Sequence, residues 1–190
     1  MDLRYRNQAA LLIRILPEIA REKYFALHGG TAINLFYHNM PRLSVDIDLT
    51  TVPFGNRKTD LALIRSKLLS IGERLRENIP DIRVKAPVEI DDELKLYCSI
   101  PEAIVKVEVN TINRGINGVP VLRPLCHKAQ EIFDSFCEIQ VVPDAQLFGG
   151  KIVAALDRQH PRDLFDIKKL GGIRKKRKVS SILSELLDKT

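Results

Sequence analysis

The feature that most constrains the fold is a set of three alternating stretches in the middle of the chain. Apolar and polar residues alternate over 81–87, 93–100 and 103–110, which is typical of half-buried strands. The short turns between them predict a meander of neighbouring strands. Further strands are predicted at 24–27, 44–50 and 138–142.

Helical periodicity surrounds these strands. Apolar residues recur at helical spacing over 7–23 and 58–78, and Pro17 is expected to kink or split the first helix. The segment 31–38 is expected to be helical and to be closed by Pro41. The final third is predicted to be helical over 144–158, 161–170 and 180–189.

This order of elements predicts an α/β (α+β) fold with a mixed sheet flanked by helices and a helical C-terminal region. We divide the chain into a core, residues 1–142, and a helical region, residues 143–190, that is expected to pack on the core. The length of 190 residues suits one such domain with an appendage.

Composition narrows the class of protein. No apolar run approaches the roughly 20 residues of a membrane span, and the N-terminal sequence MDLRYRNQ does not resemble a signal peptide. The 3 cysteines lack the CxxC spacing of a zinc site, and a disulfide framework is not expected either. We therefore expect a cytoplasmic protein with no membrane partner.

The net charge of +6 is concentrated in one short run. Without that run, 25 basic residues (30 minus 5) face 24 acidic ones. Such a run either contacts RNA phosphates or is a solvated, charged linker, and the sequence leaves both interpretations open. The run consists of Arg174, Lys175, Lys176, Arg177 and Lys178.

Two carboxylates occupy alternate positions of one predicted strand. Residues two apart on a strand point to the same face, so Asp46 and Asp48 are expected to lie together, on the side that also carries Arg42 and Ser44. Paired hard oxygen ligands suit Mg²⁺. The competing interpretation is an ordinary solvent-exposed polar face, because a DxD pattern alone has low specificity.

Two other short motifs are considered together with this carboxylate pair. Gly29, Gly30 and Thr31 join a predicted strand to a helix, where backbone amides can approach a phosphate; a plain turn with Thr31 as helix cap is the alternative. Lys106 and Glu108 share one face of the 103–110 strand. If that strand lies beside the Asp46 strand, Glu108 completes a cluster of three carboxylates, whereas an exposed Lys/Glu strand is the alternative.

The C-terminal helices contain polar residues in apolar surroundings. Lys151 lies on an apolar helix face, so its ammonium must reach water or find an anion. Asp163 suits the first turn of the helix that begins at Pro161. That structural role leaves Arg162 and Asp166 unexplained, and we regard them as supporting residues.

Together these segments resemble the AbiEii/AbiGii toxin family of nucleotidyltransferases, within the polymerase-β-like superfamily. The matching blocks are LHGGTAINL at 27–35, RLSVDIDL at 42–49, KVE at 106–108 and Lys151 through the RQHPRDLFDI of 158–167. They span roughly residues 25–170. Glu108 stands where the family usually has aspartate, His160 where it often has arginine, and the chain is short for the family.

The resemblance implies a nucleotidyltransferase-type fold and a set of residue roles. Asp46, Asp48 and Glu108 would bind metal, with two Mg²⁺ ions expected. Lys151 and Asp163 would be the essential residues of the C-terminal motifs, and Asp46, Asp48 and Glu108 would also be catalytic. The nucleotide, an NTP, would be bound by Gly29, Gly30, Thr31, Ser44, Lys106 and Lys151.

The function implied is Mg²⁺-dependent transfer of a nucleotide from an NTP to an acceptor, with RNA and in particular tRNA as the expected acceptor. The chain would act as the toxin of a toxin–antitoxin or abortive-infection system, with a cognate antitoxin as partner. Two alternatives stay open at this point. One is phosphoryl transfer to a protein or small molecule; the other is a non-catalytic module of the same fold that binds nucleotide or RNA.

Overall fold

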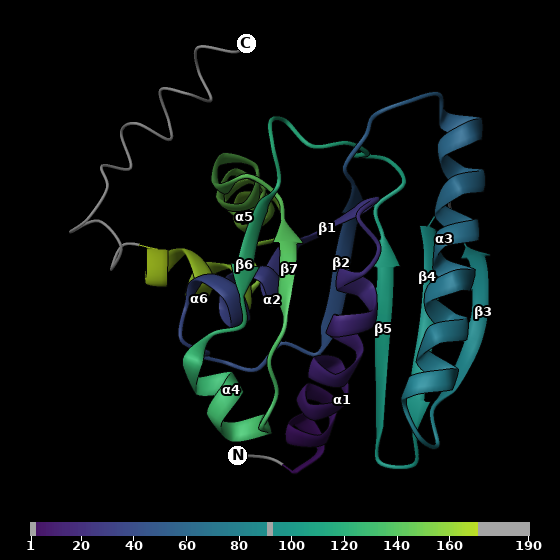
Figure 1. Ribbon diagram of the computed structural model, residues 1–190. Helices are drawn as coiled ribbons and strands as arrows, with labels where there is room; N and C mark the ends of the chain where they lie inside the picture. The colour runs from purple at the N-terminus through teal and green to yellow at the C-terminus, as the bar shows by residue number, and fades with distance from the viewer. Residues whose placement is uncertain (1–2, 91–92, 171–190) are drawn as a thin grey trace. The chain divides into compact units, whose positions relative to one another are not determined.

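The structure, a computed structural model, describes residues 3–90 and 93–170. The described residues fall into two compact units that divide between Val142 and Pro143. Within the described residues, the first unit contains a seven-stranded sheet with the strand order β3-β4-β5-β2-β1-β7-β6 (Figure 1). Its strands are β1 (Phe25–His28), β2 (Asp46–Thr51), β3 (Arg83–Ile90), β4 (Glu93–Ile100), β5 (Ala103–Val109), β6 (Val121–Pro124) and β7 (Glu138–Val141).

The sheet is mixed, as predicted. Strand β2 pairs parallel with β5 and antiparallel with β1, and β1 pairs parallel with β7. Strands β3, β4 and β5 form the predicted antiparallel meander. The parallel pairing of β2 with β5 places the strand of Lys106 and Glu108 beside the strand of Asp46 and Asp48, an arrangement that the sequence left open.

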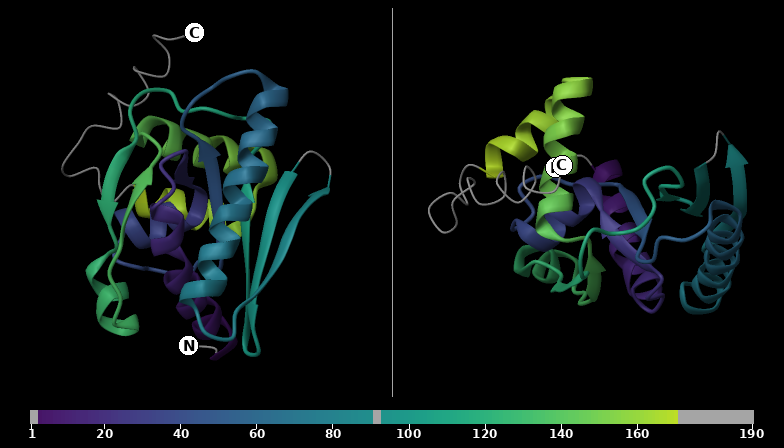
Figure 2. Two further views of the ribbon diagram at one scale, coloured as in Figure 1. Left: turned by 45° about the vertical axis from the view of Figure 1, so that its right-hand side comes forward. Right: turned by 90° about the horizontal axis from the view of Figure 1, so that it is seen from above.

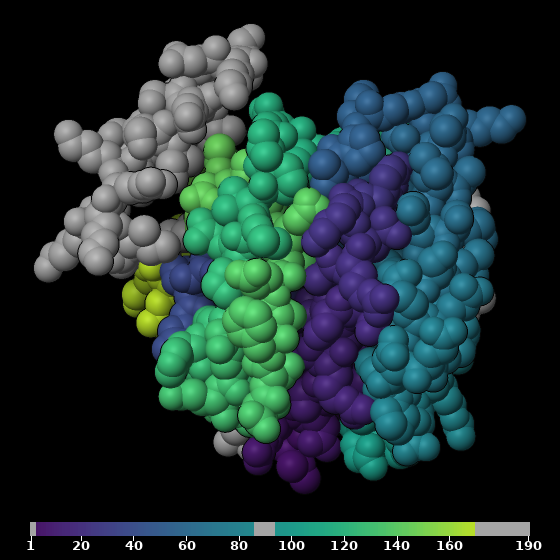
Figure 3. Space-filling model, in the orientation of Figure 1, coloured from purple at the N-terminus to yellow at the C-terminus, as the bar shows by residue number. Residues whose placement is uncertain are grey.

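Two long helices cover one face of this sheet. Helix α1 (Leu3–Ala20) contacts β5 and β7, and helix α3 (Arg57–Asn78) contacts β3 and β4. The helices also contact each other and lie side by side in the space-filling view (Figure 3). Beneath them the alternation of β5 buries Val105, Val107 and Val109, so the apolar side of the meander faces the helices and its polar side faces away from them.

The first helix begins and ends earlier in the chain than predicted. It begins at Leu3, ends at Ala20 and continues through Pro17, which does not split it. Proline removes one backbone donor from a helix. The buried side chains on both sides of it, Ile13, Leu16 and Ile19, hold the last turns against the sheet.

The segment around the first glycines also differs from the prediction. Helix α2 (Gly29–Ala32) begins directly at Gly29 and continues as the π-helix η1 (Ile33–Tyr37), so the chain leaves the helical conformation before Pro41. Strand β2 begins at Asp46. The expectation that Arg42 and Ser44 belong to this strand was therefore wrong, because regular pairing with β1 and β5 starts only beyond them.

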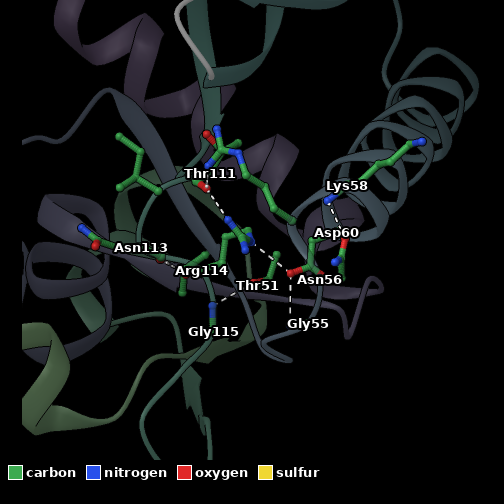
Figure 4. Close-up of polar contacts among 12 residues, drawn as sticks. Thr51, Gly55, Asn56, Lys58, Asp60, Thr111, Asn113, Arg114 and Gly115 are labelled. Carbon is green, nitrogen blue, oxygen red and sulfur yellow. Dashed lines mark hydrogen bonds and ion pairs between the residues drawn. The ribbon is translucent and has the colours of Figure 1, made fainter.

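A buried ion pair links the first turn of α3 to the loop that follows β5. The Nε atom of Arg114 lies 2.9 Å from Oδ2 of Asp60, and both side chains are buried. Arg114 also donates through Nη1 to the carbonyl oxygen of Thr111, and the amide of Gly115 donates to Oγ1 of Thr51 (Figure 4). Charged and backbone groups are thus satisfied together at this end of the sheet, which stabilises the loop after β5 against α3 and the end of β2.

The chain between β5 and the second unit contains two elements that the sequence did not reveal. They are β6, of only four residues, and helix α4 (His127–Phe133). Within the second unit, α5 (Asp144–Arg158) and α6 (Pro161–Leu170) begin and end where predicted. The packing of region 143–190 on the core stays a prediction.

Two segments of interest lie outside the described residues: the basic run Arg174–Lys178 and the predicted helix 180–189. Among the helices of residues 3–90 and 93–170, none combines the length and apolar character needed to cross a membrane.

Candidate active site

The parallel pair β2/β5 brings four charged residues onto one face of the sheet. Asp46 is the register partner of Lys106, and Asp48 is the partner of Glu108. We call this the carboxylate face. Asp46 is exposed and the other three side chains are half-buried, so the carboxylates lie on a polar surface that a ligand can reach.

An ion pair occupies part of this face. The Nζ atom of Lys106 lies 2.5 Å from Oε2 of Glu108. Burial alone would lower the pKa of Lys106, but the hydrogen bond and charge of Glu108, with the charges of Asp46 and Asp48, raise the pKa of Lys106 above its ordinary value. Lys106 is therefore held as a cation among three acidic side chains, which reduces their mutual repulsion.

Gly29 approaches this face from the end of β1. The antiparallel register places His28 opposite Asp48, and the next residue, Gly29, has φ +72°. A Cβ atom at Gly29 would lie only 2.3 Å from Oδ2 of Asp48. Glycine is therefore required here for two reasons, the left-handed backbone and the closeness of the carboxylate.

The hydroxyl of Thr31 is directed into the protein. Thr31 is fully buried, and its Oγ1 lies 2.7 Å from Oγ of Ser44 and within hydrogen-bond distance of the carbonyl oxygen of Asp46. These contacts join the start of α2 to the start of β2. The predicted role of Thr31 and Ser44 in nucleotide binding is untested; the contacts observed suit a residue pair that positions Asp46.

Two residues beside the glycines were missed by the sequence analysis as site residues. The buried Asn34 donates from Nδ2 to the carbonyl oxygen of Gly30, at 2.9 Å. The guanidinium of Arg42 also lies close to Gly30, because a Cβ atom there would be 3.0 Å from its Nη2. The spacing of four residues between Gly30 and Asn34 on a helix was the available signal for the first contact; nothing in the sequence indicated the second.

The second unit contains a separate buried cluster. Nζ of Lys151 lies 2.8 Å from Oδ1 of Asp163 and 3.3 Å from Oδ2 of Asp166, so its ammonium finds carboxylates from α6. Arg158 contacts the other oxygen of Asp163 at 3.1 Å. Arg162, in contrast, is exposed.

Electrostatics favour the ionised form of Asp163. Burial would raise the pKa of Asp163, but the hydrogen bond and charge of Lys151, followed by the charges of Arg158 and His160, lower it. The buried Asp166 gives Lys151 a second carboxylate. This explains the presence of Asp166, which the helix dipole did not.

The donor chemistry of the carboxylate face fits a hard divalent cation. Asp46 and Asp48 supply carboxylate oxygens on one face, which is what Mg²⁺ prefers. Among the residues that the structure describes, no group of three histidine, cysteine or acidic side chains is already arranged to hold a metal. The third candidate ligand, Glu108, is bonded to Lys106. All metal-binding roles therefore stay predictions.

Comparisons with known proteins agree with the fold. The family model described as "Nucleotidyl transferase AbiEii toxin, Type IV TA system" matches residues 10–187. A solved structure of MenT4, a nucleotidyltransferase toxin from Mycobacterium tuberculosis H37Rv, aligns with a TM-score of 0.64 and 15% identity, over 89% of this chain. The chain spans 59% of that toxin's length. No curated protein matches the sequence.

Proposed function

This chain belongs to the AbiEii family of nucleotidyltransferase toxins, and we propose on that basis that it transfers a nucleotide from an NTP to an RNA acceptor, with tRNA as the expected class. The observation that carries the proposal is the β2/β5 register, which sets Asp46 and Asp48 beside Glu108, with the Gly29 backbone against Asp48. The predicted family, fold class and class of enzyme are confirmed at the level of the family.

In this proposal Asp46 and Asp48 hold Mg²⁺, which when bound would neutralise triphosphate charge. Gly29 and Gly30 provide backbone close to the phosphates, because neither residue has a side chain of its own. The contacts of Thr31 with Ser44 and with the Asp46 carbonyl support a positioning role, in which Thr31 keeps the two carboxylates beside that backbone.

Glu108 is the candidate base in this proposal. It accepts the proton of the acceptor hydroxyl, whose oxygen bonds to the α-phosphorus of the NTP. The bond from that phosphorus to the bridging oxygen breaks, and pyrophosphate leaves. Glu108 must first break its ion pair with Lys106. The released Lys106 ammonium then pairs with the negatively charged phosphates. The ion pair thus supports paired roles for Lys106 and Glu108.

The C-terminal residues follow the family pattern in this proposal. Lys151 neutralises charge on the triphosphate, and Asp163 orients the side chain of Lys151. The 2.8 Å contact between them supports the orienting role. Asp166 contacts the same ammonium, and we assign it to the same task. A cytoplasmic location and an antitoxin partner are further parts of the proposal that the toxin family supports.

The test is transfer of label from each α-labelled NTP to total bacterial tRNA in the presence of Mg²⁺. Label on RNA with the wild type is expected, and Asp46→Asn should lose about 10³-fold in rate, because a lost metal ligand removes several kcal/mol of stabilisation. Asp134→Asn is the matched control, since Asp134 is exposed at the end of α4.

Three results would contradict the proposal. Wild-type turnover by Asp46→Asn would exclude the carboxylate face as the metal site. Label that arrives on protein, or only from the γ-phosphate, would indicate a different transfer reaction. If none of the four NTPs gives a labelled product, this protein lacks the proposed activity although it belongs to the family.

A further inference from the structure

The carboxylate face continues across the meander onto β4 and β3. Lys106 has Tyr97 of β4 as its register partner, and Tyr97 in turn has Lys85 of β3. A single row of side chains therefore runs from Asp46 across Lys106 and Tyr97 to Lys85. Because strands lie about 4.8 Å apart, this row extends roughly 14 Å from Asp46.

Neighbouring rows add further cations. Lys95 of β4 is the partner of Glu108, and Arg83 of β3 is the partner of Ser99, which shares the face of Tyr97. Arg83 and Lys85 are exposed, and Lys95 and Tyr97 are half-buried. We call these four residues, Arg83, Lys85, Lys95 and Tyr97, the open face.

The side chains of the open face are not needed to cover the hydrophobic core of the sheet. The alternate residues of β4, among them Leu94, Leu96 and Cys98, are buried on the opposite side, where α3 contacts β3 and β4. The strands and the helix are visible from two further directions in Figure 2. The cations therefore lie on the side of the meander away from α3, and they are continuous with the carboxylates by strand register.

We propose that the open face binds the acceptor RNA strand and leads its reacting end to Glu108. This inference rests on the proposed nucleotide transfer, whose acceptor it places. Arg83, Lys85 and Lys95 contact phosphates and Tyr97 stacks on a base. The occupant is RNA because three cations around one aromatic ring match the alternation of charge and base in a single strand.

Charge complementarity also explains the arrangement around Glu108. An acidic site repels the phosphates of an approaching RNA, and this repulsion is strongest close to Asp46 and Asp48. Cations that begin one strand away from Glu108, at Lys95, offset that repulsion on the meander side. The RNA end therefore reaches the carboxylates while its backbone lies over positive charge.

The test measures binding of labelled total bacterial tRNA to the full chain at several salt concentrations. The variant Arg83→Gln/Lys85→Gln/Lys95→Gln should make the negative slope of log affinity against log salt shallower by about 2, because each phosphate contact to a single strand contributes about −0.7 to that slope. At about 0.1 M salt the same estimate gives roughly 100-fold weaker binding. Circular dichroism melting verifies that each variant is folded.

The matched control removes three charges from the helix-covered side. It is Arg14→Gln/Lys58→Gln/Arg65→Gln, three exposed residues of α1 and α3, and binding should stay near the wild-type value. Tyr97→Ala should weaken binding by about 5- to 100-fold with an unchanged salt slope, because stacking is not electrostatic. Tyr97→Phe keeps the ring and should restore binding.

The outcomes separate this inference from the proposed activity. Equal loss of affinity in the two triple variants, or no loss in either, overturns the open face as the RNA site even if the wild type labels tRNA. Loss confined to Arg83→Gln/Lys85→Gln/Lys95→Gln and to Tyr97→Ala supports it. If these losses occur while the wild type labels no RNA, the activity is refuted and the RNA surface is retained.

Discussion

The substitution Gly29→Ala tests whether the backbone at Gly29 sets the position of Asp48. The added Cβ would lie 2.3 Å from Oδ2 of Asp48, whereas ordinary contacts begin at 3.4 Å. The carboxylate must therefore retreat by about 1.1 Å, the difference between these two distances. Misplacement of about 1 Å in an active site can cost roughly 10²-fold in rate, which is the expected loss.

The same substitution also has a cost in stability. Gly29 has φ +72°, and a non-glycine residue in the left-handed region costs about 1–2 kcal/mol. Urea denaturation should therefore show a free energy of unfolding lower by about that amount. The two effects must be separated, so activity is measured as the initial rate of nucleotide transfer at a temperature where the variant is fully folded.

Gly115→Ala is the matched control. Gly115 has φ +81°, and its added Cβ would lie 2.7 Å from Cβ of Phe54. It should lose comparable or greater stability yet keep most of the wild-type rate, because its steric conflict is with Phe54 and not with a carboxylate. The reasoning is refuted if Gly29→Ala retains more than half of the wild-type rate when folded, or if Gly115→Ala loses as much rate.

Two further predictions concern buried charge. Arg114→Met should lower the free energy of unfolding by about 3–5 kcal/mol, since it removes the cation that pairs with the buried Asp60 carboxylate. Urea denaturation tests this, and a second substitution, Asp60→Met, should recover part of the loss. The pKa of Asp163 is lowered in the folded protein, so its contribution to stability is present above its ordinary pKa and is lost as pH falls through the lowered value. The stability difference between the wild type and Asp163→Asn should therefore be constant above about pH 5 and shrink in more acidic buffer, whereas a difference independent of pH would exclude this role of the Lys151 ion pair.

The carboxylate face was largely predictable from the sequence. Alternation at Asp46, Asp48, Lys106 and Glu108 assigns each pair to one side of its strand, because the side-chain period of a strand is two. That the two strands are neighbours was left as a condition by the sequence and was shown by the pairing of β2 with β5. The helices α5 and α6 were equally predictable, since Pro161 marks the start of the second and apolar periodicity defines both.

Individual side-chain contacts were not predictable in this way. The 2.5 Å ion pair of Lys106 with Glu108 depends on rotamers that alternation does not specify. The bond from the buried hydroxyl of Thr31 toward β2 was not predictable either, because the start of β2 at Asp46 depends on sheet pairing. The buried pair of Asp60 and Arg114 joins residues 54 positions apart, and no local pattern indicated it.

The sequence by itself determined which residues share a face, where the long helices lie, and which family the motifs resemble, because these depend on local periodicity and on short motifs. Only the tertiary structure decided which faces meet. The register of β5 between β2 and β4 places Lys95 and Tyr97 beside the carboxylates. Strand order and register are set by long-range packing of the apolar sides against α1 and α3, which a linear pattern does not contain.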